Sequence, residues 1–116
     1  VVELQGGAIT SYTIQPCDLP ISTHSPAAIA ALTAQSSDES LQLVREALGD
    51  ETSAAADIVS LNAGAAIYVA GVAETLRDGV VMAKDAIASG LANERLEELV
   101  ATSSLMAEQN SESNDL

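Results

Sequence analysis

Residues 57–71 have the sequence Asp-Ile-Val-Ser-Leu-Asn-Ala-Gly-Ala-Ala-Ile-Tyr-Val-Ala-Gly, and this stretch decides the fold. Its apolar residues recur at helical spacing and fill nearly every face, which predicts an α-helix with one amide, Asn62, in its middle. A surface helix has a polar face, so we expect this helix to be covered on all sides. Asn62 should then be buried and bonded to a neighbouring backbone group.

The rest of the chain offers little bulk with which to cover such a helix. The 116 residues include no Phe, no Trp and only 2 Tyr, and much of the hydrophobic 47% is Ala, which buries little area. The composition therefore predicts that a partner or a further length of chain completes the core. We interpret the sequence as a piece of a larger protein. A start at Val rather than Met fits that interpretation.

The charge balance excludes two classes of partner. With 17 acidic and 4 basic residues the formal net charge is -13, so phosphate backbones and anionic membranes would repel the chain. We expect no nucleic acid partner and no membrane contact. The uncharged run 58–73 is also shorter than the ~20 apolar residues of a membrane span. A single cysteine, Cys17, excludes an internal disulfide and suits a cytoplasmic location.

A β-hairpin followed by about five helices is the expected order of elements. The runs 1–4 and 8–14 flank Gly6-Gly7, which suits a tight hairpin turn, and a proline-broken loop follows. Serine caps, a Ser36 to Glu39 capping box and terminal glycines place the helices. We expect the first helix to start at Ser25-Pro26 and the next three to span 36–48, 53–71 and 74–89. A last helix should end at about residue 101. Their expected buried faces are Leu41, Val44 and Leu48, then Leu76, Val80, Ala83 and Ile87, then Leu96, Leu99 and Val100.

The end of the chain differs in composition from the rest. From Thr102 onward it is polar and acidic without a hydrophobic period, which predicts disorder. We therefore expect residues 1–101 to belong to a large α/β domain and residues 102–116 to form a disordered acidic tail.

The search for chemistry within the chain predicts no catalytic, cofactor-binding or metal-ligating residue. A His/Cys metal site needs several ligands, and the chain has only His24 and Cys17. These two could also be imagined as a base and a nucleophile, but no orienting group is identifiable, and an inert thiol is the favoured interpretation. No glycine run has the sequence context of a phosphate loop. The many carboxylates lie on polar helix faces, where solubility explains them.

Three segments in order resemble one known family. The first comprises residues 1–4 (Val-Val-Glu-Leu) and 7–19 (Gly-Ala-Ile-Thr-Ser-Tyr-Thr-Ile-Gln-Pro-Cys-Asp-Leu). The others are the stretch 57–71 and residues 85–92 (Asp-Ala-Ile-Ala-Ser-Gly-Leu-Ala). Together they are similar to the carboxyl-terminal third of anthranilate phosphoribosyltransferase, over residues 1 to about 100. The signature Leu-Asn-Ala-x-Ala-Ala-(hydrophobic)-Tyr-Val-Ala-Gly at 61–71 is the most specific part.

The resemblance implies a fold, an activity and partners for the parent enzyme. The fold would be of the nucleoside phosphorylase/phosphoribosyltransferase type, with this chain packing on the central sheet and the parent forming a homodimer. The activity would be transfer of the phosphoribosyl group of phosphoribosyl pyrophosphate to anthranilate, with Mg2+, in tryptophan biosynthesis. The family's substrate and metal groups all precede the point that matches Val1, so this segment would be structural and inactive by itself.

The chain departs from the family at Cys17, Pro20 and Gly64. Gly64 should weaken the apolar helix by about 1 kcal/mol unless close packing uses it. A second hypothesis is a small acidic helical carrier or interaction protein with Ser40 as the attachment site. Against it, Glu39 stands where the carrier motif has Asp, and carriers do not begin with a β-hairpin.

Overall fold

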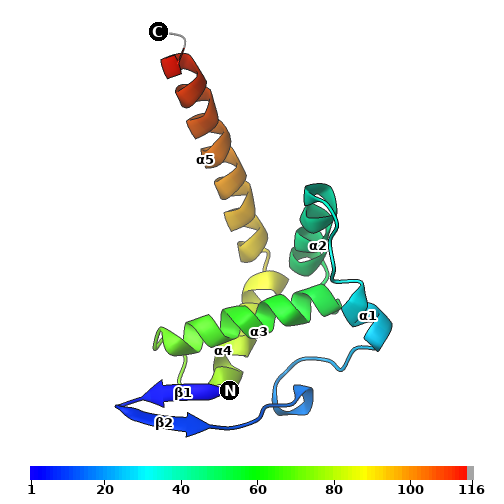
Figure 1. The fold of residues 1–116 in the computed structure, drawn as a ribbon, viewed down its shortest axis with the longest axis vertical. Coiled ribbons are helices and arrows are strands. Elements are labelled where there is room, and N and C mark those ends of the chain that lie inside the picture. Colours follow the sequence, from blue (N-terminus) through cyan, green and yellow to red (C-terminus); the bar gives the residue numbers. More distant parts are fainter. Residues whose placement is uncertain (115–116) are drawn as a thin grey trace.

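A computed structural model describes the backbone of residues 1–114 and the side chains of residues 1–109. It contains a β-hairpin, a 3-10 turn and five α-helices, in agreement with the expected order (Figure 1). The elements are β1 (Val2–Gln5), β2 (Ala8–Ser11), η1 (Pro16–Asp18), α1 (Pro26–Ala30), α2 (Ser37–Gly49), α3 (Ala54–Val69), α4 (Leu76–Ala88) and α5 (Leu91–Asn114).

The hairpin forms where the sequence predicts it. Strands β1 and β2 are antiparallel, with Leu4 opposite Ile9, and Gly6 and Gly7 make the turn at φ of 58° and 82°. Two successive positive φ angles match the right-handed twist of the strands, which explains the two glycines. Alternation along β1 places Leu4 on one face of the hairpin and Glu3 on the other.

The helix ends also follow the sequence. Serine or threonine side chains accept a backbone hydrogen bond at the start of α1 to α4, and the caps are Ser25, Ser36, Ser53 and Thr75. The first three are those predicted. Positive φ angles at Gly71 and Gly90 follow α3 and α4, where the sequence places their ends. These are local effects, because a cap needs only its own turn of helix.

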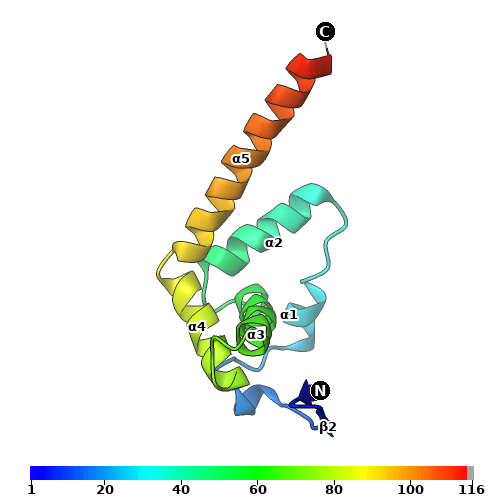
Figure 2. The same ribbon diagram turned by 90° about the vertical axis from the view of Figure 1, so that its left-hand side faces the viewer.

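Helix α3 is the centre of the molecule. Figure 2 looks along it and shows α4 at one side, α2 above and the hairpin below. Its closest neighbour is α4, and the two meet at Gly64 and Gly79. A Cβ on Gly64 would lie 2.6 Å from the Cα of Val80, and a Cβ on Gly79 would lie 2.3 Å from the carbonyl oxygen of Gly64. The close approach of α3 and α4 therefore depends on the missing side chain of Gly64. This is the condition under which the sequence predicts no weakening of the helix by that glycine.

The core around this crossing is built mainly of small residues. The buried hydrophobic residues are Leu19, Ala47, Ala55, Ala56, Ala73, Val80, Ala83 and Ile87. The predicted buried face of α4 is confirmed, since Val80, Ala83 and Ile87 are buried and Leu76 is half-buried. The packing is close rather than bulky, in keeping with an alanine-rich composition.

The predicted buried face of α2 is wrong in part. Leu41 and Val44 are 39% and 40% exposed, while Leu48 is half-buried. The side of α2 that faces α3 instead contains half-buried Leu43 and buried Ala47. The small side chain of Ala47 lets α2 approach α3 closely, which a larger residue at this point would prevent.

Helix α5 also differs from the expectation. The sequence predicts disorder from Thr102, but the helix continues to Asn114 and projects away from the body (Figure 1). Residues 105–109, Leu-Met-Ala-Glu-Gln, are strong helix formers, and this propensity favours continuation of the helix although the residues are exposed. Leu99 and Val100, expected to pack, are 65% and 55% exposed, and only Leu96 is half-buried. The domain boundary at 101 stays a prediction, and residues 115–116 lie outside the described part.

Candidate functional site

The most highly connected polar group is the carboxylate of Asp57, in the first turn of α3. Its Oδ2 accepts hydrogen bonds of 2.8 Å from the backbone N–H of Ser22 and from Nε2 of His24, and its Oδ1 accepts one of 2.7 Å from Nζ of Lys84. The Asp57 side chain is 4% exposed. We call these four residues the Asp57 cluster. It ties the loop before α1 and the middle of α4 to the start of α3.

The electrostatics of the cluster favour the charged carboxylate. Burial by itself would raise the pKa of Asp57, but hydrogen bonds from Lys84, Ser22 and His24 and the charge of Lys84 outweigh it and hold the pKa below its ordinary value. A carboxylate can only accept, so Nε2 of His24 carries the proton in this pair. Both carboxylate oxygens of Asp57 accept hydrogen bonds from within the chain, so we interpret the cluster as a structural contact rather than a reactive group.

The sequence did not predict this cluster, because no local pattern connects Asp57 with Lys84. His24 was weighed with Cys17, but the structure pairs it with Asp57, while Cys17 is exposed and lies against its neighbour Asp18. The signal that could have found it was an acidic residue in an otherwise apolar helix, because a carboxylate there needs partners from elsewhere in the chain.

Asn62 does not have the environment predicted for it. Its side-chain amide donates to the carbonyl oxygen of Ile58 at 2.8 Å, as expected of a bond to neighbouring backbone. The residue is exposed, however, so the prediction of burial is wrong within this chain. The reason is that, within residues 1–114, no element covers this face of α3.

A cavity of about 530 Å³ lies between the hairpin and α3. Its lining is mostly aliphatic, with a polar group at Glu3, whose carboxylate accepts hydrogen bonds from the hydroxyls of Tyr12 (3.1 Å) and Tyr68 (2.5 Å). Desolvation and the bond to Glu3 raise the pKa of Tyr12, and the bond to Glu3 is the main cause that raises the pKa of Tyr68. Both phenols stay protonated at neutral pH, and the bond from Tyr68 to Glu3 joins α3 to the hairpin.

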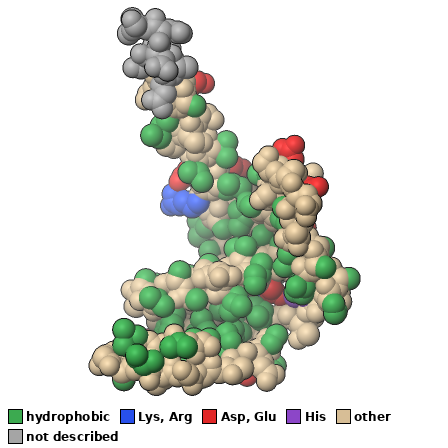
Figure 3. Space-filling model, viewed as in Figure 1, with side chains coloured by type: hydrophobic (Ala, Val, Ile, Leu, Met, Phe, Trp, Pro, Cys, Tyr) green, Lys and Arg blue, Asp and Glu red, His purple; other side chains and the backbone are tan. Residues whose placement is uncertain are grey.

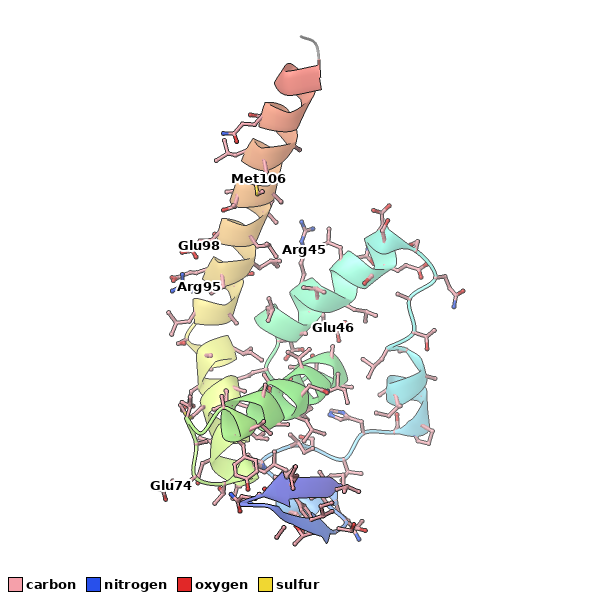
Figure 4. The ribbon with its side chains drawn as sticks, turned by 60° about the vertical axis from the view of Figure 1, so that its left-hand side comes forward. Arg45, Glu46, Glu74, Arg95, Glu98 and Met106 are labelled. Atoms are coloured by element: carbon pink, nitrogen blue, oxygen red, sulfur yellow. The ribbon has the colours of Figure 1, made fainter. Side chains whose placement is uncertain are left out.

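The cationic groups of the described residues do not gather into an anion site. Lys84 is bound to Asp57, and Arg77 donates to the carbonyl oxygen of Asp18. Arg95 pairs with Glu98 on the outer surface of α5, and Arg45 is exposed on α2 (Figure 4). Nor do the described residues bring together three or more His, Cys, Asp or Glu side chains that could hold a metal ion. They therefore do not fit the Mg2+ that the resemblance implies for the parent. Of the helices in residues 1–114, none combines the length and the apolar character that crossing a membrane requires.

Comparison with known families identifies the domain to which this fold belongs. Residues 1–93 match the model of the glycosyl transferase family, a/b domain. The match covers more than half of the chain, so the chain belongs to this family. It ends near the start of α5, and the projecting part of that helix lies beyond it.

Several individual relatives carry the same name. The chain is 49% identical over 105 residues to the anthranilate phosphoribosyltransferase of Cellvibrio japonicus, covering 87% of this chain and 30% of the relative. It is 43% identical over 114 residues to that of Ectopseudomonas mendocina, covering 95% and 32%. It is 47% identical over 109 residues to that of Saccharophagus degradans, covering 90% and 31%. The chain thus spans about 30% of the length of the curated relatives it matches.

Proposed function

We propose that this chain is the carboxyl-terminal part of an anthranilate phosphoribosyltransferase. The enzyme would transfer the phosphoribosyl group of phosphoribosyl pyrophosphate to anthranilate, in the cytoplasm and in the pathway of tryptophan biosynthesis. The observation that carries the proposal is 49% identity sustained over 87% of the chain to a relative of that name. The shared segment includes the apolar helix α3, the element around which this chain is organised.

Within that enzyme the chain has a supporting role. Phosphoribosyl transfer separates charge onto pyrophosphate, which calls for cationic groups or metal-held carboxylates at the reacting centre. Of the four basic residues, Lys84, Arg77 and Arg95 are engaged elsewhere, and Arg45 is exposed on α2, apart from the others. We therefore assign no catalytic, cofactor-binding or metal-ligating residue to this chain. Mg2+ and both substrates belong to the proposal through the parent, whose amino-terminal remainder would hold them, and the parent would be a homodimer.

The alternative of a small acidic carrier has no support. Ser40 lies on α2 and lines a small hollow with aliphatic neighbours such as Leu43 and Ala47. The family match includes α2, which makes this helix part of a glycosyl transferase domain. Nothing at Ser40 distinguishes it as an attachment site.

Two measurements on the cellular protein test the proposal. Its intact mass should be about three times 11.8 kDa, since the chain covers about 30% of its relatives. The intact protein should form phosphoribosylanthranilate from anthranilate and phosphoribosyl pyrophosphate with Mg2+, whereas residues 1–116 alone should form none. An intact protein of parental length without this activity would contradict the proposed reaction, and activity of residues 1–116 alone would contradict the supporting role.

A further inference from the structure

The β-hairpin is held to the rest of the molecule by little packing. Nearly every residue of β1 and β2 is exposed, including Val2 (74%), Leu4 (71%) and Ile9 (71%). In the space-filling view the hairpin lies near the lower edge, with hydrophobic side chains open at its surface (Figure 3). A cavity of about 530 Å³ also lies between it and α3. Because an isolated two-stranded hairpin is at best marginally stable in water, its position needs a further contact.

One side-chain hydrogen bond supplies that contact. Glu3 is the one half-buried residue of the two strands, and its Oε1 accepts a hydrogen bond of 2.5 Å from the hydroxyl of Tyr68 in α3, 65 residues away. A hydrogen bond to a charged carboxylate is stronger than one between two neutral groups. Among residues 1–109, whose side chains the structure describes, no other side-chain hydrogen bond joins the hairpin to a helix. We call it the hairpin–α3 bond.

A second phenol on the same carboxylate makes a more local contact. The hydroxyl of Tyr12 donates to Oε2 of Glu3 at 3.1 Å, but Tyr12 directly follows β2, so this bond does not reach a helix. The two tyrosines thus present the same chemical group to the same carboxylate, and only Tyr68 connects the hairpin to α3. Tyr12 is therefore a matched comparison for Tyr68.

The hairpin also determines how the chain enters this part of the molecule. The main-chain nitrogen of Val1 donates to the carbonyl oxygen of Tyr12 at 2.8 Å, and the N–H of Tyr12 donates to the carbonyl oxygen of Val1 at 3.0 Å. The strand pairing therefore reaches the first residue of the chain. A polypeptide joined to Val1 starts from a backbone whose position and direction the pairing fixes. The hairpin–α3 bond in turn fixes the hairpin relative to the helices.

We infer that Tyr68 is a positioning residue for the proposed phosphoribosyl transfer and acts through Glu3. The inference rests on the proposed function, in which this chain spans about 30% of the enzyme and the groups that hold the substrates lie in the remainder joined at Val1. Groups at a reacting centre must be held to within roughly 0.5 Å of their working geometry. The hairpin–α3 bond contributes to this alignment because it restricts motion where the two parts of the enzyme meet.

The test compares two hydroxyl deletions in the intact protein. Tyr68→Phe removes the hairpin–α3 bond and keeps the ring, and Tyr12→Phe removes the other phenol from the same carboxylate. We expect Tyr68→Phe to lower kcat for phosphoribosylanthranilate formation about 10-fold and to change KM less than about 2-fold, because the substrates still bind but are less well aligned. Tyr12→Phe should leave both constants within about 2-fold of the wild type. Rates are measured at a temperature at which circular dichroism shows every variant to be folded.

Two variants of Glu3 show whether Tyr68 acts through it. Glu3→Gln keeps an oxygen that can accept the phenol and should retain kcat within about 2-fold. Glu3→Ala removes the acceptor and should lower kcat about 10-fold, and Tyr68→Phe in that background should lower it no further, because both changes break the same bond. A further loss in the Glu3→Ala background would show that Tyr68 acts by another route and would overturn the inference.

The remaining outcomes are also decisive. Equal kcat values for Tyr68→Phe and Tyr12→Phe overturn the inference and leave the proposed function intact, since the wild type still forms the product. A rise in KM without a change in kcat overturns it as well, because Tyr68 would then affect substrate binding alone. A lower melting temperature of Tyr68→Phe with the kcat of the wild type makes the bond purely structural and has the same consequence. An inactive wild-type protein overturns the proposed function, and the inference falls with it.

Discussion

Helices α4 and α5 follow one another in the chain, yet one is packed and the other is not. Helix α4 buries Val80, Ala83 and Ile87 against α3, whereas α5 leaves larger side chains such as Leu99 and Met106 59–65% exposed. Figure 4 shows Met106 on the part of α5 that extends away from the other helices. The difference lies in the partner surface: two glycines let α3 and α4 approach backbone to backbone, whereas the described side chains on the outer part of α5 are exposed. Hydrophobicity alone therefore does not decide burial in this protein.

The largest expected effect comes from a methyl group added where α3 and α4 cross, which would remove the close packing that distinguishes α4 from α5. Gly79→Ala places a Cβ 2.3 Å from the carbonyl oxygen of Gly64, and the two backbones must separate. We expect a loss of about 3 kcal/mol in the free energy of unfolding, despite the better helix propensity of Ala. Urea unfolding of the intact protein measures it. The matched control is Gly49→Ala, where a Cβ meets nothing within 4 Å and the change should be neutral or slightly stabilising.

The second expected effect is at the Asp57 cluster beside the crossing. Asp57→Asn keeps the shape of the side chain but removes its charge from Lys84 and His24. We expect a loss of about 2 kcal/mol at pH 7, because buried partners of an ion pair are left incompletely compensated. Asp85→Asn, at an exposed position on the same helix as Lys84, is the control and should change stability by less than ~0.5 kcal/mol. Equal effects of the two variants would contradict the role given to the cluster.

The same cluster predicts a pH dependence. The folded-state pKa of Asp57 lies below its ordinary value, so its stabilisation is present above the unfolded pKa of about 4 and is lost as pH falls through the folded value. The stability difference between the wild type and Asp57→Asn should therefore be full at pH 7 and shrink as pH falls below about 4. Urea unfolding at a series of pH values measures the difference. A difference that stays constant down to the lowest pH at which the protein folds would contradict the assignment.

The next variant should raise the free energy of unfolding instead of lowering it, and by a smaller amount. Ser60 is fully buried in α3, and its hydroxyl has no hydrogen-bond partner among the described residues. Ser60→Ala removes this unpaired group without adding volume, so we expect a gain of ~1 kcal/mol in the free energy of unfolding. Thermal unfolding measures it. A loss of stability would show that the hydroxyl has a partner in the intact enzyme.

The smallest expected effect is at the outer end of α5. Removal of residues 102–116 should change the stability of the intact protein by less than ~0.5 kcal/mol, because the described side chains from 102 to 109 are exposed. Differential scanning calorimetry of the shortened protein tests it. A fall of several degrees in melting temperature would show that this segment docks on another part of the enzyme.

Features that depend on one turn of chain could be predicted from the sequence. The glycine turn of the hairpin, the serine caps and the glycines that follow α3 and α4 all agree with the structure. Partners distant in the sequence could not be predicted. His24 and Lys84 lie 33 and 27 residues from Asp57, and no local pattern connects them. The rotation of α2 was also missed, because several stripes of that helix are apolar enough to pack.

The sequence by itself determined that α3 is apolar on nearly every face, that the chain is strongly acidic, and that its similarity is to one enzyme family. Short-range physics suffices for these, since helical periodicity, caps and composition are properties of neighbouring residues. Only the tertiary structure decided which faces of α3 are covered and that Gly64 and Gly79 set the distance between two helices. It also decided that a buried carboxylate joins three segments of the chain. Those outcomes depend on the fit of surfaces far apart in sequence, where a single Cβ or a single charge determines whether two elements can meet.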